Sequence, residues 1–200
     1  ENLFRFSNYV GSKHFKIIFK HSELSEKQIK EFGDKLEDVD ISKVTFHFLT
    51  KKKKYLGDIA KNVTGYDYPL YKTPEERFDA ISNWVMSLIN DIHSNVYIEG
   101  YSYGSKGQGL FQIAENGGLL KHKLWKSSNI ELNILVPSVV KKRTTGKGNA
   151  DKQMMYEQFM KDGGTDLVSE LGMNKLDNPV TDIVDSYYIM RTGYEDRYSN

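Results

Sequence analysis

The chain has 200 residues, a formal net charge of +1 and no cysteine. Without cysteine it can form neither a disulfide nor a cysteine-ligated zinc site, which fits a reducing, cytoplasmic setting. No apolar run approaches the ~18 residues of a membrane-spanning helix, and the N-terminus lacks the charged and apolar regions of a secretory signal.

The N-terminal part predicts three strands and a helix. Leu3–Tyr9 and His14–Lys20 flank a turn at Gly11 and predict a hairpin. Ser25 opens a capping-box pattern for a short amphipathic helix. Lys43–Thr50 alternates apolar and polar residues, as a half-buried strand does.

The middle of the chain contains the clearest helix start. Residues 51–72 have no clear periodicity, so we predict a long surface connection within an insertion spanning about residues 21–72. Thr73 and Pro74 suit the N-cap and first position of a helix, and apolar residues then recur at three- and four-residue steps as far as Ile92. Asn95–Tyr101 follows as a strand.

The C-terminal half predicts one more strand among helices. The expected elements are a helix over Leu110–Lys123, a strand over Ile130–Val136 ended by Pro137, a helix capped by Asn149 and running to Lys161, a short helix over Asp166–Leu171 and a final helix capped by Asn178. This order predicts a mixed α/β sheet with helices on its faces. We expect a single domain over residues 1–193 and a frayed tail over 194–200.

Three carboxylates are candidate metal ligands. Asp182 and Asp185 lie three residues apart in the first turns of the last predicted helix, so they can point at one object. Glu99 ends the apolar strand Val96–Glu99, at the edge where open α/β sheets build their sites. Divalent cations prefer such anionic oxygen ligands. The alternative is structural: the helix dipole favours acidic residues in a first turn, and a Glu at a strand end is often only solvated.

Basic residues form local stripes at Lys51–Lys54, Lys121–Lys126 and Lys141–Lys152. The segment Thr145–Lys152 leads into a helix but lacks the Ser or Thr and the first glycine of a nucleotide-binding phosphate loop, so we expect no nucleotide cofactor. A glycine-rich turn at a helix start can instead hold a DNA phosphate, unless it is simply a solvated loop. The candidate DNA contacts are Lys141, Lys142, Arg143, Lys147, Lys152 and Tyr103, the last by stacking on an unpaired base.

Three of these motifs, in this order, resemble the RuvC-like Holliday junction resolvases, especially their phage and viral branch. They are Val96–Glu99, Thr145–Lys152 and Asn178–Tyr187, within a resemblance that covers roughly residues 73–192. It implies an RNase H-like fold with a mixed five-stranded sheet and helices on both faces. It also implies a homodimer formed through the helix after Gly109, and a role in DNA recombination and repair in the cytoplasm, of a host if the protein is phage-encoded.

The resemblance also implies the chemistry. Glu99 matches the family's second catalytic carboxylate, and Asp182 and Asp185 match its C-terminal pair. Four such carboxylates hold two Mg²⁺ or Mn²⁺ ions ~3.5–4 Å apart and cleave four-way or other branched DNA. The family's first Asp, on a central opening strand, has no match here. We therefore expect ~10–25 further residues upstream of Glu1, which supply this Asp on a strand placed between the hairpin and the strand that ends at Glu99.

Two other functions remain open. One is a branched-DNA-binding module that does not cleave because its metal site is incomplete. The other is a nuclease of the same fold that acts on flaps, RNA–DNA hybrids or transposon ends. A protein that has lost one ligand would also explain the missing Asp, but the absence of an initiator Met favours the upstream strand.

Overall fold

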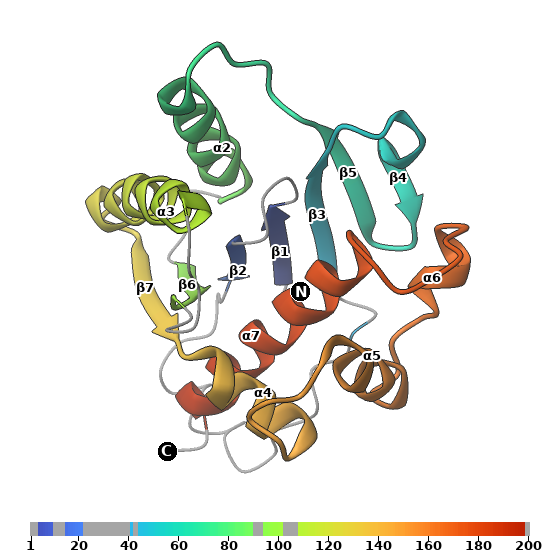
Figure 1. The fold of residues 1–200 in the computed structure, drawn as a ribbon. Helices are drawn as coiled ribbons and strands as arrows, with labels where there is room; N and C mark the ends of the chain where they lie inside the picture. Colours follow the sequence, from blue (N-terminus) through green and yellow to red (C-terminus); the bar gives the residue numbers. More distant parts are fainter. Residues whose placement is uncertain are drawn as a thin grey trace.

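The computed structural model describes residues 4–9, 15–21, 41, 44–89, 94–101 and 108–198. In these residues the strands form one seven-stranded sheet in the order β4-β5-β3-β1-β2-β6-β7, with α-helices on both faces (Figure 1). The mixed α/β class with helices on both faces is as predicted, but the expected sheet of five strands is wrong. The strands are β1 (Phe4–Tyr9), β2 (Phe15–His21), β3 (Val44–Thr50), β4 (Gly57–Ala60), β5 (Val63–Asp67), β6 (Ser94–Glu99) and β7 (Ile130–Leu135).

The predicted N-terminal hairpin is present at the centre of the sheet. β1 and β2 pair antiparallel, with Phe4 opposite Lys20 and Tyr9 opposite Phe15. On its other side β2 pairs antiparallel with β6, where Ile17 lies opposite Ile98. The sheet therefore has no room for another strand between the hairpin and β6, and the expected position of an additional strand is wrong.

Residues 51–72 are more ordered than their sequence predicts. They contain the short 3-10 helix η2 (Lys53–Tyr55) and the strands β4 and β5, and β5 pairs parallel with β3. Gly65 explains why β5 can lie so close to η2, because a Cβ there would be 1.8 Å from the Tyr55 carbonyl oxygen. The prediction of an irregular surface connection is therefore wrong for this segment, which extends the sheet by two strands.

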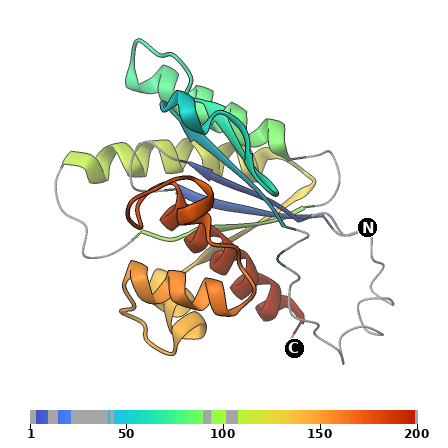
Figure 2. The ribbon, with the colours of Figure 1, turned by 90° about the vertical axis from the view of Figure 1, so that its right-hand side faces the viewer.

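One face of the sheet is covered by α2 (Pro74–Leu88) and α3 (Gln108–Lys126) (Figure 2). The predicted start of α2 is confirmed: the Thr73 hydroxyl accepts the Glu76 amide at 3.3 Å, and Pro74 is the first helical residue. This satisfies an amide that the first turn leaves without a partner in the helix. On this face β6 residues Val96 and Ile98 pack in one buried cluster with Val85, Leu120 and Leu124.

Among the described residues, the other face carries the larger core and four helices, α4 (Pro137–Thr145), α5 (Lys152–Lys161), α6 (Leu167–Glu170) and α7 (Val180–Tyr198). The sequence did not predict α4, because Pro137 appeared only to end a strand, whereas it also occupies the first helical position. Asp151, not Asn149, caps α5 through the Met154 amide at 2.9 Å.

The expected frayed tail is wrong for residues 194–198, because α7 continues to Tyr198. Arg197 forms an ion pair of 2.8 Å with Glu131 of β7, and Asp196 forms one with Arg143 of α4. Two predictions lie outside the described residues, the helix from Ser25 and the stacking role of Tyr103. Within the described part of the chain, no helix is both long and apolar enough to cross a membrane.

Candidate functional site

Glu99 lies at the end of a buried strand, on the side of the sheet that α7 covers. Side chains alternate along a strand, so Asn95, Tyr97 and Glu99 of β6 share one face. Tyr97 belongs to the core that includes α7, and Asn95 accepts a hydrogen bond from Arg197 of α7. Glu99 itself is half-buried. Its carboxylate is therefore placed on the α7 side of the sheet.

The predicted aspartate pair lies in the first turns of α7. The helix begins at Val180, and the amide of Asp182 donates to the Pro179 carbonyl oxygen at 3.1 Å. Asp182 and Asp185 are both half-buried. Asn178, expected to cap the backbone, accepts instead from the hydroxyl of buried Thr181. The start of α7 is thus held by a side-chain contact rather than by the predicted cap.

Gly193 fixes how α7 is turned toward the sheet. A Cβ at Gly193 would lie 2.3–2.6 Å from ring atoms of Tyr97, so the helix backbone rests on that ring. Eleven residues make about three helical turns, so Asp182 lies on the same side of α7 as Gly193. Asp182 is therefore on the side of α7 that faces the sheet, and Asp185 lies beside it.

The structure does not assemble these carboxylates into a finished metal site. Among the described residues, no group of three or more His, Cys, Asp or Glu side chains is arranged to hold a metal ion. Asp182 lies ~16 Å along the helix axis from Gly193, and α7 crosses β6, β2 and β1 over that length (Figure 1). The described carboxylates thus do not by themselves form a complete metal centre.

The predicted DNA contacts divide into two groups. Lys142 and Lys147 are exposed, Lys141 is half-buried, and none of the three forms an ion pair with another described residue. Arg143 and Lys152 instead contact α7. Arg143 pairs with Asp196 and donates to the Thr192 carbonyl oxygen at 3.4 Å, while Lys152 donates to the Thr181 hydroxyl at 3.2 Å. Both residues therefore anchor the basic segment to the helix that carries the aspartates.

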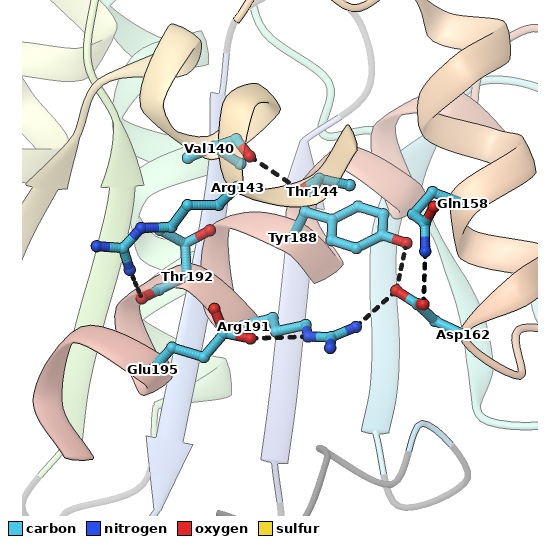
Figure 3. Close-up of polar contacts among 9 residues, drawn as sticks. All are labelled: Val140, Arg143, Thr144, Gln158, Asp162, Tyr188, Arg191, Thr192 and Glu195. Atoms are coloured by element: carbon cyan, nitrogen blue, oxygen red, sulfur yellow. Dashed lines mark hydrogen bonds and ion pairs between the residues drawn. The ribbon is translucent and has the colours of Figure 1, made fainter. Parts of the chain in front are cut away.

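A polar cluster that the sequence did not reveal joins α5 to α7 around Asp162 (Figure 3). The Asp162 carboxylate accepts from Tyr188 at 2.9 Å, Gln158 at 2.8 Å and Arg191 at 2.5 Å, and Arg191 also contacts Glu195 at 2.9 Å. Burial, and next the hydrogen bond to Asp162, raise the pKa of Tyr188. The cluster lines a pocket of about 250 Å³ between α4, α5 and α7.

This cluster holds α5 against α7, because Asp162 at the end of α5 accepts from buried Tyr188 and half-buried Arg191 of α7. The sequence offered only one signal for it, Arg191 and Glu195 at the i, i+4 spacing of a helical ion pair. Asp162 follows the last residue of α5. Nothing in its local sequence indicates that it contacts Tyr188 of α7, which lies 26 residues later in the chain.

Comparison with known proteins adds little to this geometry. No family model matches the chain, and no curated protein is similar to it in sequence. Among solved structures, the chain is similar to the RuvC structure of Thermus thermophilus, with a TM-score of 0.45 and 17% identity over 63% of this chain and 71% of that chain. At this TM-score the likeness carries no argument about fold or activity, so the proposals below rest on the residues and their placement.

Proposed function

We propose that this protein is an RNase H-like, RuvC-type endonuclease that cleaves branched DNA such as four-way junctions. The observation that supports the proposal is the shared placement of its carboxylates. Glu99 ends a buried parallel strand, and α7 packs on the same face of the sheet with Asp182 turned toward it. Open α/β sheets build their sites beyond the carboxyl ends of such strands. In this proposal Glu99, Asp182 and Asp185 are the catalytic carboxylates, and cleavage depends on Mg²⁺ or Mn²⁺.

The basic segment after β7 supports DNA as the substrate. Lys141, Lys142 and Lys147 belong to α4 and the turn that follows it, and the left-handed Gly146 (φ 78°) ends α4 just before Lys147. Lysines on a helix and its flanking turn can bind the phosphate backbone without reading sequence. Arg143 and Lys152 contribute indirectly, because they keep this segment fixed to α7.

We propose further that the protein acts as a homodimer through α3. Phe111 and Trp125 are 69% and 74% exposed although both are large apolar residues. They lie seven residues on either side of Gly118, which has nothing within 4 Å of a Cβ. A seven-residue repeat on one helix side suits packing against a second helix. A two-fold dimer would present two carboxylate sites to the two strands of a junction.

A second candidate function is branched-DNA binding without cleavage. It is favoured by one observation, that the described residues contain no group of three carboxylates or histidines able to hold an ion. A protein of this kind would protect or mark junctions with the same basic segment and the same dimer. The two candidates differ only in turnover, so one experiment separates them.

The decisive experiment uses a labelled mobile four-way junction, with a flap and an RNA–DNA hybrid as further substrates. Cleavage is measured with Mg²⁺ or Mn²⁺ and binding is measured with Ca²⁺. We expect Glu99→Gln and Asp185→Asn each to abolish cleavage while binding stays near wild type, since each removes an oxygen ligand and little packing. Asp79→Asn, on the opposite face of the sheet, is the matched control and should cleave normally.

Turnover that persists in both carboxylate variants would defeat the site assignment. Junction binding by the wild type with no cleavage under any metal would favour the second candidate. Lys147→Ala should weaken binding to all branched substrates and lower the salt dependence by about one phosphate contact. Lys175→Ala, an exposed lysine on the loop before α7, is the control for that change.

A further inference from the structure

The loops at the ends of β3 and β5 carry an exposed surface that the proposed nuclease site does not use. Lys51–Lys54 directly follow β3 and are all exposed. Leu70 is 99% exposed and Tyr71 is 39% exposed, and both lie in the loop between β5 and α2. We call Lys51, Lys52, Leu70 and Tyr71, together with the adjacent half-buried Arg77 of α2, which also donates to Gln112 at 2.9 Å, the lysine–tyrosine surface.

Cations and aromatic rings are interleaved on this surface. The Lys51 ammonium lies 4.8 Å from the ring centre of Tyr68 and 5.6 Å from that of Tyr71. The Arg77 guanidinium lies 5.6 Å from the Tyr71 ring centre. Tyr68 is buried and meets Tyr71 edge-on at 6.2 Å, so it holds the outer ring in place. Burial raises the pKa of Tyr68 to about 12, so no phenolate there neutralises the neighbouring cations near neutral pH.

Three of the acidic residues nearby, Glu75, Glu76 and Asp58, are used in local structure. Glu76 accepts the Lys72 amide at 2.6 Å and donates its own amide to Thr73. The pKa of Glu75 is lowered by its own backbone amide and next by Thr73. Asp58 accepts from Thr64 across the β4–β5 pair at 2.7 Å. These carboxylates are thus used within local turns and strands, while the lysine run remains exposed.

Folding alone gives little reason for this arrangement. Four consecutive lysines repel one another, and an apolar Leu70 side chain that is almost fully in water contributes no burial. The cation–aromatic pairs stabilise the loop only modestly at exposed positions. A ligand that supplies both negative charge and flat apolar surface would satisfy all of these groups together, and single-stranded nucleic acid has this chemistry.

We propose that the lysine–tyrosine surface binds an unpaired strand of DNA, with phosphates on Lys51, Lys52 and Arg77 and a base stacked on Tyr71 beside Leu70. The choice of DNA rests on the proposed function. β3 and β6 run in the same direction, so Lys51 and Glu99 follow strands that end at the same edge of the sheet. An unpaired arm held on this surface therefore approaches the edge where Glu99 lies.

The test compares two fluorescent ligands by anisotropy in Ca²⁺. One is an oligothymidylate of ~20 nucleotides, longer than the ~4–16 nucleotides that one such site covers. The other is a fully paired four-way junction. Tyr71→Ala and the double variant Lys51→Ala/Lys52→Ala should each weaken oligothymidylate binding about tenfold or more and change junction binding by less than about twofold. Tyr71→Phe keeps the stacking ring and should bind oligothymidylate like wild type.

Lys175→Ala is the matched control for loss of one exposed charge, and thermal unfolding of each variant checks that the fold is intact. Unchanged oligothymidylate binding in the variants, or an equal loss on both ligands, would overturn the inference. If the wild type binds the paired junction but not oligothymidylate, the inference fails while the proposed function stands. If it binds oligothymidylate but never the junction, the proposed function fails and the single-strand surface stands.

Discussion

The helices α3 and α7 have the same length, 19 residues, yet they lie in opposite surroundings on the two faces of the sheet (Figure 2). α7 is packed on the sheet and covered from outside by α4 and α5, so Ile183, Tyr187 and Tyr188 are all about 1% exposed. α3 packs on the sheet through Leu120 and Leu124 but leaves Phe111 and Trp125 exposed. The helix with the candidate catalytic aspartates is thus fixed between two layers.

This difference indicates different uses for the two faces. A helix enclosed on two sides holds its polar groups in a defined geometry, which a catalytic site requires. A helix covered on one side only presents apolar area that a partner can bury. The variants below test the contrast between the two faces, in order of decreasing expected effect.

Gly193→Ala should have the largest effect, because the new Cβ would overlap the Tyr97 ring that supports α7. Overpacking a core contact of this kind should cost ~3 kcal/mol of unfolding free energy, measured by urea denaturation. A double-mutant cycle with Tyr97→Leu should show strong coupling, since the smaller side chain makes room for the methyl group. Additive effects in that cycle would mean that Tyr97 is not the obstacle.

Asp162→Ala should be the next most damaging change. It leaves Arg191 and Tyr188 without their shared acceptor in a partly buried position, at a cost of ~2 kcal/mol. The matched variant on the other face is Asp79→Ala, which removes the ion pair with Lys123. Because the Asp79 side chain is 57% exposed, water screens that pair and its loss should cost well under ~1 kcal/mol.

The same pair gives a pH test. The hydrogen bond from Lys123 lowers the pKa of Asp79, so its small stabilisation is present above the ordinary carboxyl pKa and is lost as the pH falls through the lowered value. The unfolding free energy of Asp79→Ala should therefore differ from that of the wild type least in acid and most near neutral pH. Equal losses for Asp162→Ala and Asp79→Ala near neutral pH would contradict the contrast between the two faces.

Phe111→Ser and Trp125→Ser should leave unfolding free energy within ~0.5 kcal/mol of wild type, because both residues are exposed in one chain. If α3 forms the dimer, each should weaken self-association about tenfold or more in sedimentation equilibrium. Lys126→Ala, at the end of the same helix, is the control for a change that leaves the apolar stripe intact. A monomeric wild type would remove the argument for a dimer.

Gly118→Ala should change the unfolding free energy least, and in the opposite direction from Gly193→Ala. A Cβ at Gly118 meets nothing within 4 Å, and alanine favours a helix over glycine by ~0.5–1 kcal/mol. The same substitution on two helices of equal length should therefore stabilise one face and destabilise the other. Thermal unfolding at low protein concentration, where dimer formation contributes little, measures this directly.

Local rules predicted the elements whose signals lie within a few residues. Thr73 and Pro74 start α2, and the apolar run before Glu99 forms β6, because caps and buried strands are specified by neighbouring residues. α4 was missed because a proline can either end a strand or occupy the first position of a helix, and Pro137 does both. β4 and β5 were missed because their order depends on pairing with β3 rather than on a periodic pattern.

The arrangement of the sheet and site depends on contacts between distant residues, which local patterns do not contain. Nothing in Phe15–His21 indicates that it pairs with residues 94–98 rather than with a further strand. Likewise the basic neighbours of Arg143 predict a DNA contact, and nothing local indicates that Asp196, 53 positions later, forms an ion pair with it. Glu99 and Asp182 share one face of the sheet because α7 packs on the face to which Glu99 belongs. Their catalytic role is part of the proposed function.

The position of α7 in the chain has a consequence for synthesis and quality control. This helix supplies much of the main core, and among the described elements it is the last to leave the ribosome. Until it emerges, one face of the sheet exposes Phe46, Phe48 and Tyr97 to the cell, and pairing of strands that lie far apart in the chain is a slow kind of folding step. Truncation before Val180 would therefore remove the aspartate pair and much of the main core together, so a shortened product should be degraded rather than persist in a folded form.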